Sequence, residues 1–173
     1  SSKTIFKYWS NTSFGTKIQE ICHEVLEGFA STTSGRDIEF IDSIDNRKKY
    51  CQIKAGPDTI NKDDVETIVG HFKGVKNLAR TNGLKLQYDD LIVGVLYGNK
   101  GQLNANYKKI DREHQYPVIV GQDFWHRLTG DEKFYVDLIN AFGQVAIEAD
   151  STKLLKDTIN ALAEDIKNSE EFG

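Results

Sequence analysis

Residues 37–57 read DIEFIDSIDNRKKYCQIKAGP and carry the clearest structural pattern of the chain. Two runs rich in β-branched and aromatic residues, 38–42 and 50–54, flank a polar turn that contains Asp45 and Asn46. Extended runs of this kind, separated by turn-forming residues, predict a β-hairpin. The hairpin ends in the sequence Ala-Gly-Pro, where glycine and proline break regular structure.

Outward from the hairpin, the chain alternates between helical and extended patterns. Apolar residues recur at helical spacing over residues 16–29 and 63–81, which predicts two amphipathic helices. Residues 91–97 and 117–120 are apolar on both faces, as is typical of central strands covered on both sides. The end of the chain is expected to be helical over residues 123–128, 131–149 and 151–168.

Strands mixed with helices, including one strand–helix–strand crossover, predict an α/β fold, an α+β mixed sheet with helices on both faces. The sequence shows no clear strand before residue 38. Gly28 and the Ser/Thr run at 31–34 end the first helix. The length fits a single domain, residues 1–173. Its helical part, 131–168, either completes the core or forms a dimer interface through Phe134, Tyr135, Leu138 or the stripe 154–166.

Composition indicates a soluble cytoplasmic protein. The chain is 39% hydrophobic and 28% charged, and no apolar run approaches the roughly 20 residues that span a bilayer. Cys22 and Cys51 both lie in apolar patterns, so we expect reduced core thiols. The net charge of −4 argues against indiscriminate coating of nucleic acid but permits a local basic surface. Neither a Walker A loop nor a Gly-x-Gly-x-x-Gly motif occurs, so no nucleotide cofactor is expected.

The hairpin gathers polar side chains on one face. If its turn is centred on the Asp-Asn dipeptide, Asp37 lies opposite Lys54 and Glu39 opposite Gln52. Cross-strand partners share a face, as do residues two apart on one strand. Asp42 falls on the other face, so Asp37 is the preferred acidic residue. A register slip of one residue would reverse this choice.

Such a cluster suits phosphodiester hydrolysis. Carboxylate oxygens hold Mg²⁺ and leave part of its hydration shell in place. Asp37 would be the main metal ligand, Gln52 a weaker one through its amide oxygen, and Ile53 a further one through its backbone carbonyl. Lys54 would orient or deprotonate the attacking water and stabilise the pentavalent phosphorus.

Asp37, followed by residues 52–54 after a hairpin and before a helix, resembles the PD-(D/E)XK nuclease signature. The wider stretch 37–57 and the later stretch 118–125, VIVGQDFW, resemble type II restriction endonucleases of that superfamily. The similarity runs over about 14–149. It implies a restriction-endonuclease-like core and a homodimer that cuts double-stranded DNA at a short palindromic site. It also implies Mg²⁺, which Mn²⁺ can replace, and a bacterial or archaeal cytoplasm.

Besides lacking a clear strand before residue 38, the sequence departs from the family pattern at two positions. Gln52 stands where the family has an acid, so another carboxylate must complete the site. Glu20 and Glu24, on the first expected helix, are candidates because relatives often donate a helical glutamate, and Glu39 of the hairpin is a third. Arg36 precedes the acidic residue in place of the family's proline.

Two regions offer contacts to DNA. On the helix over 63–81, one edge carries residues suited to phosphate contacts: Lys73, Lys76, Asn77 and Arg80. The polar stretch 99–116 is rich in amides and cations that suit base reading: Asn99, Lys100, Gln102, Asn104, Asn106, Lys108, Lys109, Arg112, His114 and Gln115. From this stretch we select Lys108, Lys109 and Arg112 as DNA-contacting residues. A solvated helix face and an ordinary polar loop are the alternatives.

Two other functions remain open at this point. The chain could be a nuclease of the same superfamily with a repair, junction-cleaving or transposon-excising task, which structure-specific cleavage would favour. It could also be a catalytically degenerate DNA-binding relative, which the replacement of an acid by Gln52 favours. DNA binding without metal-dependent cleavage would identify that second alternative.

Overall fold

The computed structural model describes Glu24, Leu26, residues 31–34 and residues 37–172. Of the helix expected over residues 16–29, the structure describes only Glu24 and Leu26, and both are helical. Among the residues that the structure describes, no helix contains an apolar run that could span a lipid bilayer.

The centre of the fold is one mixed sheet with strand order β1-β2-β3-β4-β5. Its antiparallel part consists of β1 (Ser31–Ser34), β2 (Asp37–Ile41) and β3 (Lys48–Lys54). The strands β4 (Leu91–Val95) and β5 (Val118–Val120) extend it in parallel to β3. The predicted α/β (α+β) mixed sheet and its hairpin are confirmed.

The strand β1 corrects the expectation that no strand precedes residue 38. Ser31, Thr32 and Ser34 pair antiparallel with β2, with an irregularity between Thr32 and Ser34, and the strand completes a three-stranded meander. The sequence Ser-Thr-Thr-Ser contains no alternating apolar residue, so it carries no hydrophobic signal of a strand. Main-chain pairing with β2 defines this strand instead.

Two predicted helices are confirmed with small changes at their ends. Helix α3 (Lys62–Thr81) begins at Asn61, whose side chain accepts from the Asp64 backbone N–H while the Asp64 carboxylate accepts from the Asn61 N–H. This reciprocal capping fixes where the helix starts. Helix α5 (Gln122–Thr129) ends at Gly130, which adopts a left-handed conformation with φ of 78°.

The polar stretch 99–116 contains helix α4 (Ala105–Arg112), which the sequence did not predict. The side chain of Asn104 caps it by accepting from the backbone N–H groups of residues 106 and 107. Only Tyr107 and Ile110 are buried in this short helix, so its apolar periodicity is too brief to recognise. Two 3-10 turns, Tyr88–Asp90 and Lys100–Gln102, precede β4 and α4.

The C-terminal part is one helix, α6 (Phe134–Phe172), rather than two helices separated at residue 150. Asp150 and Ser151 only weakly disfavour the helical backbone, and neither is a proline, so the helix passes through them. By compactness the chain divides into two units, Ser1–Val136 and Asp137–Gly173. Each unit is therefore considered by itself.

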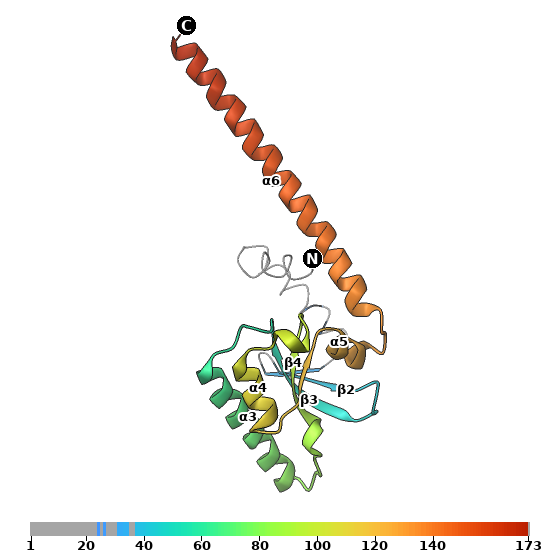
Figure 1. Ribbon diagram of the computed structural model, residues 1–173. Helices are drawn as coiled ribbons and strands as arrows, with labels where there is room; N and C mark the ends of the chain where they lie inside the picture. Colours follow the sequence, from blue (N-terminus) through green and yellow to red (C-terminus); the bar gives the residue numbers. More distant parts are fainter. Residues whose placement is uncertain (1–23, 25, 27–30, 35–36, 173) are drawn as a thin grey trace. The chain divides into compact units, whose positions relative to one another are not determined.

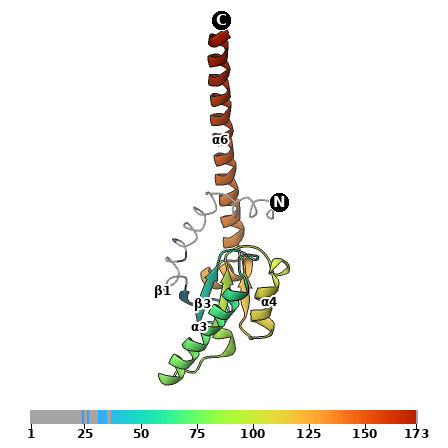
Figure 2. The same ribbon diagram turned by 90° about the vertical axis from the view of Figure 1, so that its left-hand side faces the viewer.

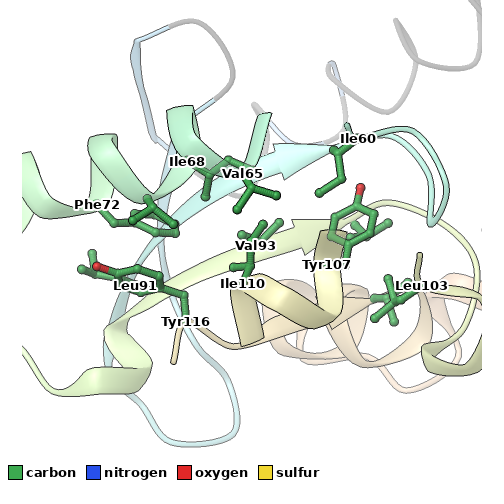
Figure 3. Packing of buried hydrophobic residues seen from close by; sticks show 13 residues of the cluster. Ile60, Val65, Ile68, Phe72, Leu91, Val93, Leu103, Tyr107, Ile110 and Tyr116 are labelled. Atoms are coloured by element: carbon green, nitrogen blue, oxygen red, sulfur yellow. The ribbon is translucent and has the colours of Figure 1, made fainter. Parts of the chain in front are cut away.

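Helices cover both faces of the sheet in the first unit. Figure 1 and the turned view in Figure 2 show α3 and α4 together on one face, and the two helices contact each other. Apolar residues of these helices, of their connecting segments and of β4 and β5 form a core, shown in Figure 3: Ile60, Val65, Ile68, Val69, Phe72, Leu91, Val93, Val95, Leu103, Tyr107, Ile110, Tyr116 and Val120. Helix α5 covers the other face, where Phe124 packs so close to Gly94 that a β-carbon there would lie 2.6 Å from its ring.

Candidate active site

Asp37 and Gln52 form a directly opposed pair between β2 and β3. Both residues are more than nine-tenths buried, with exposed fractions of 7% and 8%. Lys54 follows two residues later on β3, on the same face, and is half-buried. These three side chains project from the face that α3 covers, because Gln52 and Lys54 pair with the core residues Val93 and Val95 of β4.

The pairing register differs by two residues from the expected one. Asp37 lies opposite Gln52 rather than Lys54, and Glu39 opposite Tyr50 rather than Gln52. The hairpin turn is centred one residue earlier than expected, because the Asp42 N–H donates to the Arg47 carbonyl at 2.9 Å. A shift of two residues leaves every side chain on its expected face.

A histidine of α3 contacts the acidic residue. His71 Nε2 lies 2.8 Å from Asp37 Oδ2, and its side chain is 36% exposed. Tyr50 stacks on the imidazole with ring centroids 6.0 Å apart, and its hydroxyl lies 3.3 Å from the same nitrogen. The sequence did not single out His71 as a site residue. Its position three residues after the buried Ile68, at the edge of the apolar stripe, was the available signal.

The side chain of Gln52 has an unusual environment. Within the described part of the chain its amide makes no hydrogen bond, although the residue is 8% exposed. Buried side-chain amides are almost always hydrogen-bonded, to protein, water or a bound group. An amide oxygen beside a buried carboxylate is a donor set that fits a hard cation such as Mg²⁺. Ile53 lies between Gln52 and Lys54, with its side chain buried on the opposite face.

The glutamates that were candidates for completing a metal site differ in their surroundings. Glu39 forms an ion pair with Lys48, with 3.0 Å between Oε2 and Nζ. Glu24 is an exposed helical residue, and Glu20 lies outside the described residues. No group of three or more His, Cys, Asp or Glu side chains is placed to hold a metal among the residues that the structure describes.

The two expected DNA-contacting regions lie on neighbouring helices. Lys73, Lys76, Asn77 and Arg80 are all exposed on α3. The Lys76 ammonium lies 4.6 Å from the centre of the Tyr116 ring, so this lysine also packs against the segment that follows α4. Lys108 and Arg112 of α4 are exposed and Lys109 is half-buried. Because α3 and α4 contact each other, these cations lie on the same side of the sheet as Asp37.

Several amides of the stretch 99–116 have structural contacts. Asn104 and Asn106 both donate side-chain hydrogen bonds to the Ile60 carbonyl, at 3.0 and 3.1 Å. Gln102 accepts from the Asn99 N–H at 3.0 Å. Tyr107, fully buried, donates to the Gly56 carbonyl at 2.7 Å, and burial raises the pKa of its hydroxyl. These contacts hold α4 and the loop that follows β3 together.

Away from this face, the far end of the hairpin carries a buried ionic network. Arg47 donates two hydrogen bonds to Asp90, at 3.0 and 2.6 Å. The Lys49 ammonium, 1% exposed, lies 2.5 Å from Asp45 and 3.8 Å from Asp90. Burial alone would raise the pKa of Asp90, but the hydrogen bonds from Arg47 hold that pKa below its usual value. This network ties the hairpin to the start of β4.

Cys51 is buried beneath the sheet on the side opposite Asp37. Its residue is 0% exposed, and burial raises the pKa of its thiol well above the usual range. A thiol of this kind stays protonated and unreactive at neutral pH. The expectation of a reduced core cysteine is met at this position, whereas Cys22 lies outside the described residues.

The meander, the parallel extension, and an acid, an amide and a lysine on one covered face together form the core of a restriction-endonuclease-like nuclease. A family model of the type II restriction endonuclease EcoO109I matches residues 3–150 of the chain. The chain belongs to this family of type II restriction endonucleases, which are site-specific DNA endonucleases acting on double-stranded DNA. A search of curated protein sequences gives no match.

Proposed function

We propose that the chain is a Mg²⁺-dependent type II restriction endonuclease that hydrolyses phosphodiester bonds of double-stranded DNA at a short palindromic site. The observation that carries this proposal is the directly opposed pair of Asp37 and Gln52, both buried, with Lys54 beside them on the same face. Membership of the family indicates that the substrate is DNA. The three side chains of the site are suited to hydrolysis of a phosphodiester bond.

The metal would be held by the Asp37 carboxylate, the Gln52 amide oxygen and the Ile53 carbonyl, with a glutamate, Glu20, Glu24 or Glu39, completing the set. Bound Mg²⁺ activates a water and neutralises charge on the phosphate, and Mn²⁺ can replace it. Asp37 and Gln52 are fixed on neighbouring strands, so their oxygens need little reorganisation to bind.

Lys54 serves the attacking water in this proposal. It is half-buried, and among the described residues its ammonium forms no ion pair, so its charge stays available. It orients the water toward phosphorus and stabilises the negative charge of the pentavalent state. As the new P–O bond forms, the bond to the leaving oxygen breaks, and that oxygen takes a proton.

Cutting both strands of a palindrome calls for two identical sites related by a twofold axis. We assign the dimer contact to the helical part 131–168, which we regard as belonging to the single domain 1–173. On α6, Ile159, Leu162 and Ile166 are 56%, 57% and 62% exposed. Their spacing of three and four residues is that of a coiled-coil seam. A second copy of the same helix fits this seam.

DNA cleavage tests the nuclease. A mixed panel of plasmid and phage DNA is incubated with Mg²⁺ or Mn²⁺ and the native chain, Lys54→Ala or Lys85→Ala. Lys85 is exposed and lies between α3 and the turn before β4, so its variant controls for the loss of a lysine. We expect discrete fragments from the native chain and from Lys85→Ala, and none from Lys54→Ala, which still binds DNA. Intact DNA with the native chain in both metals would rule the proposal out.

The oligomeric state tests the dimer. Leu162→Glu places a charge in the seam, whereas Asn160→Glu places the same charge on an exposed position outside it. By analytical ultracentrifugation we expect a dimer for the native chain and for Asn160→Glu, and a monomer for Leu162→Glu. A dimer that survives Leu162→Glu would move the interface elsewhere.

The replacement of an acid by Gln52 favours one second candidate, a relative that binds DNA without cutting it. That function is the outcome if the native chain binds DNA fragments tightly in a filter-binding or anisotropy assay but leaves them intact with both metals. Cleavage that follows junctions or mismatches rather than a sequence would instead indicate a repair or junction-cleaving nuclease of the same superfamily.

A further inference from the structure

A short polar contact, from His71 to Asp37, links α3 to the hairpin. A carboxylate that binds a metal is ionised and only accepts hydrogen bonds. Its Oδ2 lies 2.8 Å from His71 Nε2, so this nitrogen carries the hydrogen and donates it. The contact therefore fixes the tautomer of the imidazole as well as the rotation of the carboxylate.

The helical turn that carries the imidazole is anchored in the core. Ile68, three residues before His71, and Phe72, directly after it, are both 0% exposed. Tyr50 stacks on the ring, with an angle of 27° between the two planes. His71 is thus a rigid donor on a helix rather than a mobile surface side chain.

A carboxylate needs such a donor because its last torsion is soft. Rotation about the bond that carries the two oxygens is broad, with no sharp staggered wells. Metal-ligating carboxylates are commonly hydrogen-bonded by an outer partner, and loss of that partner weakens metal binding or activity by about 10-fold to 100-fold.

From these contacts we infer that His71 is a positioning residue: through its Nε2 hydrogen it orients Asp37 for the divalent cation and so sets the metal concentration that the enzyme requires. This inference rests on the proposed metal-dependent nuclease function. It adds a residue of α3 to the strand residues Asp37 and Gln52, and it gives a role to the histidine at the edge of the apolar stripe of α3. His71 touches neither the phosphate nor the water in this role.

Two amide substitutions separate positioning from packing. In His71→Gln the side-chain amide nitrogen reaches the position of Nε2, so the donor to Asp37 is retained. In His71→Asn the amide lies nearer the backbone, at the position of Nδ1, and the donor is lost. Both variants remove the imidazole ring and its stacking on Tyr50 equally, so any effect of that loss on folding cancels between them.

The experiment measures the Mg²⁺ concentration for half-maximal cleavage and, independently, the rise in melting temperature that Mg²⁺ produces without DNA. We expect His71→Asn to raise the half-maximal Mg²⁺ concentration by about 10-fold or more and to shrink the thermal shift. His71→Gln should stay close to the native values, and DNA affinity in Ca²⁺ should be equal in all three proteins.

Equal Mg²⁺ midpoints and equal thermal shifts in the two variants would overturn the inference. So would a loss of DNA affinity in both variants with an unchanged Mg²⁺ midpoint, because His71 would then contact DNA directly. The proposed function fails separately, if the native chain cuts nothing. In that case, a Mg²⁺-dependent thermal shift that His71→Asn loses and His71→Gln keeps would still support the positioning role.

Discussion

Asp37 lies directly opposite Gln52 across the antiparallel pair of β2 and β3, and both residues are more than nine-tenths buried. Side chains of directly opposed residues approach within about 5.5 Å at their β-carbons. A carboxylate and an amide therefore share one small space. The PD-(D/E)XK pattern has an acid at the position of Gln52, so in this chain a charged side chain faces a neutral one.

This relationship predicts the behaviour of Gln52→Glu. Two opposed carboxylates in a buried space repel each other, so the metal-free variant should be less stable than the native chain by about 1 kcal/mol or more. A divalent cation relieves the repulsion, so Mg²⁺ should raise the melting temperature more in the variant than in the native chain. Thermal unfolding over a Mg²⁺ series measures both effects.

The control for this comparison is Gln144→Glu, which makes the same change at an exposed position of α6. It should shift neither the metal-free stability nor the response to Mg²⁺. If Gln52→Glu responds to Mg²⁺ no more strongly than the native chain, residue 52 is not a metal ligand.

Among the three glutamates that could complete the metal site, Glu39 is expected to contribute least. Its carboxylate pairs with Lys48 at 3.0 Å, with side chains 25% and 66% exposed, and such surface pairs contribute about 0–1 kcal/mol. Glu39→Gln should therefore leave the cleavage rate and the Mg²⁺ midpoint nearly unchanged, whereas Glu20→Gln or Glu24→Gln should raise the midpoint. A large loss of cleavage in Glu39→Gln alone would make Glu39 the missing ligand.

Local patterns in the sequence were sufficient for the parts of the fold that have a strong hydrophobic period. The hairpin, α3, β4 and β5 each combine a clear apolar pattern with a strong start or stop. The shared face of Asp37, Gln52 and Lys54 also followed from the sequence. This prediction holds although the expected register was wrong by two residues, because a shift by an even number of residues leaves each side chain on the same face of the sheet.

The remaining features depend on contacts distant in sequence. β1 has no apolar residue and is a strand only because β2 pairs with it. The link from His71 to Asp37 joins residues 34 positions apart, and no spacing rule relates a helix to a preceding strand. α4 has a stripe of two buried residues, too short for a period to emerge.

The ionic network at the far end of the hairpin predicts an acid-dependent stability. Asp90 is nearly buried and accepts both hydrogen bonds from Arg47, whose side chain is 36% exposed. Asp90→Asn should lower the free energy of unfolding by about 2 kcal/mol at neutral pH, less than for a fully buried pair because Arg47 is partly solvated. Asp89→Asn, at a side chain 40% exposed and 3.9 Å from Lys49, should change it by less than about 0.5 kcal/mol.

The difference in the free energy of unfolding between the native chain and Asp90→Asn depends on pH, and the direction of the Asp90 pKa shift determines how. The pKa of Asp90 is lower in the folded protein than its usual 3.8, so the folded state binds the proton less readily than the unfolded state. The stabilisation is complete above the unfolded pKa and is lost as the pH falls through the folded pKa. Urea unfolding at several pH values should show the difference between native chain and Asp90→Asn shrinking below pH 3.8. A constant difference would mean that the charge of Asp90 is not involved.

The exposed cations of α3 predict a measurable salt dependence of DNA binding. Lys73 and Arg80 are exposed on the helix that covers the Asp37 face, so they can reach phosphates without contacting bases. Each phosphate contact contributes about −0.9 to the slope of log affinity against log salt concentration. The double variant Lys73→Ala, Arg80→Ala should therefore reduce the slope by nearly two and weaken binding to all DNA sequences alike. Lys76 is left in place because it also packs on Tyr116. Lys85→Ala serves as the control and should leave the slope unchanged, and an unchanged slope in the double variant would show that DNA does not lie along this edge of α3.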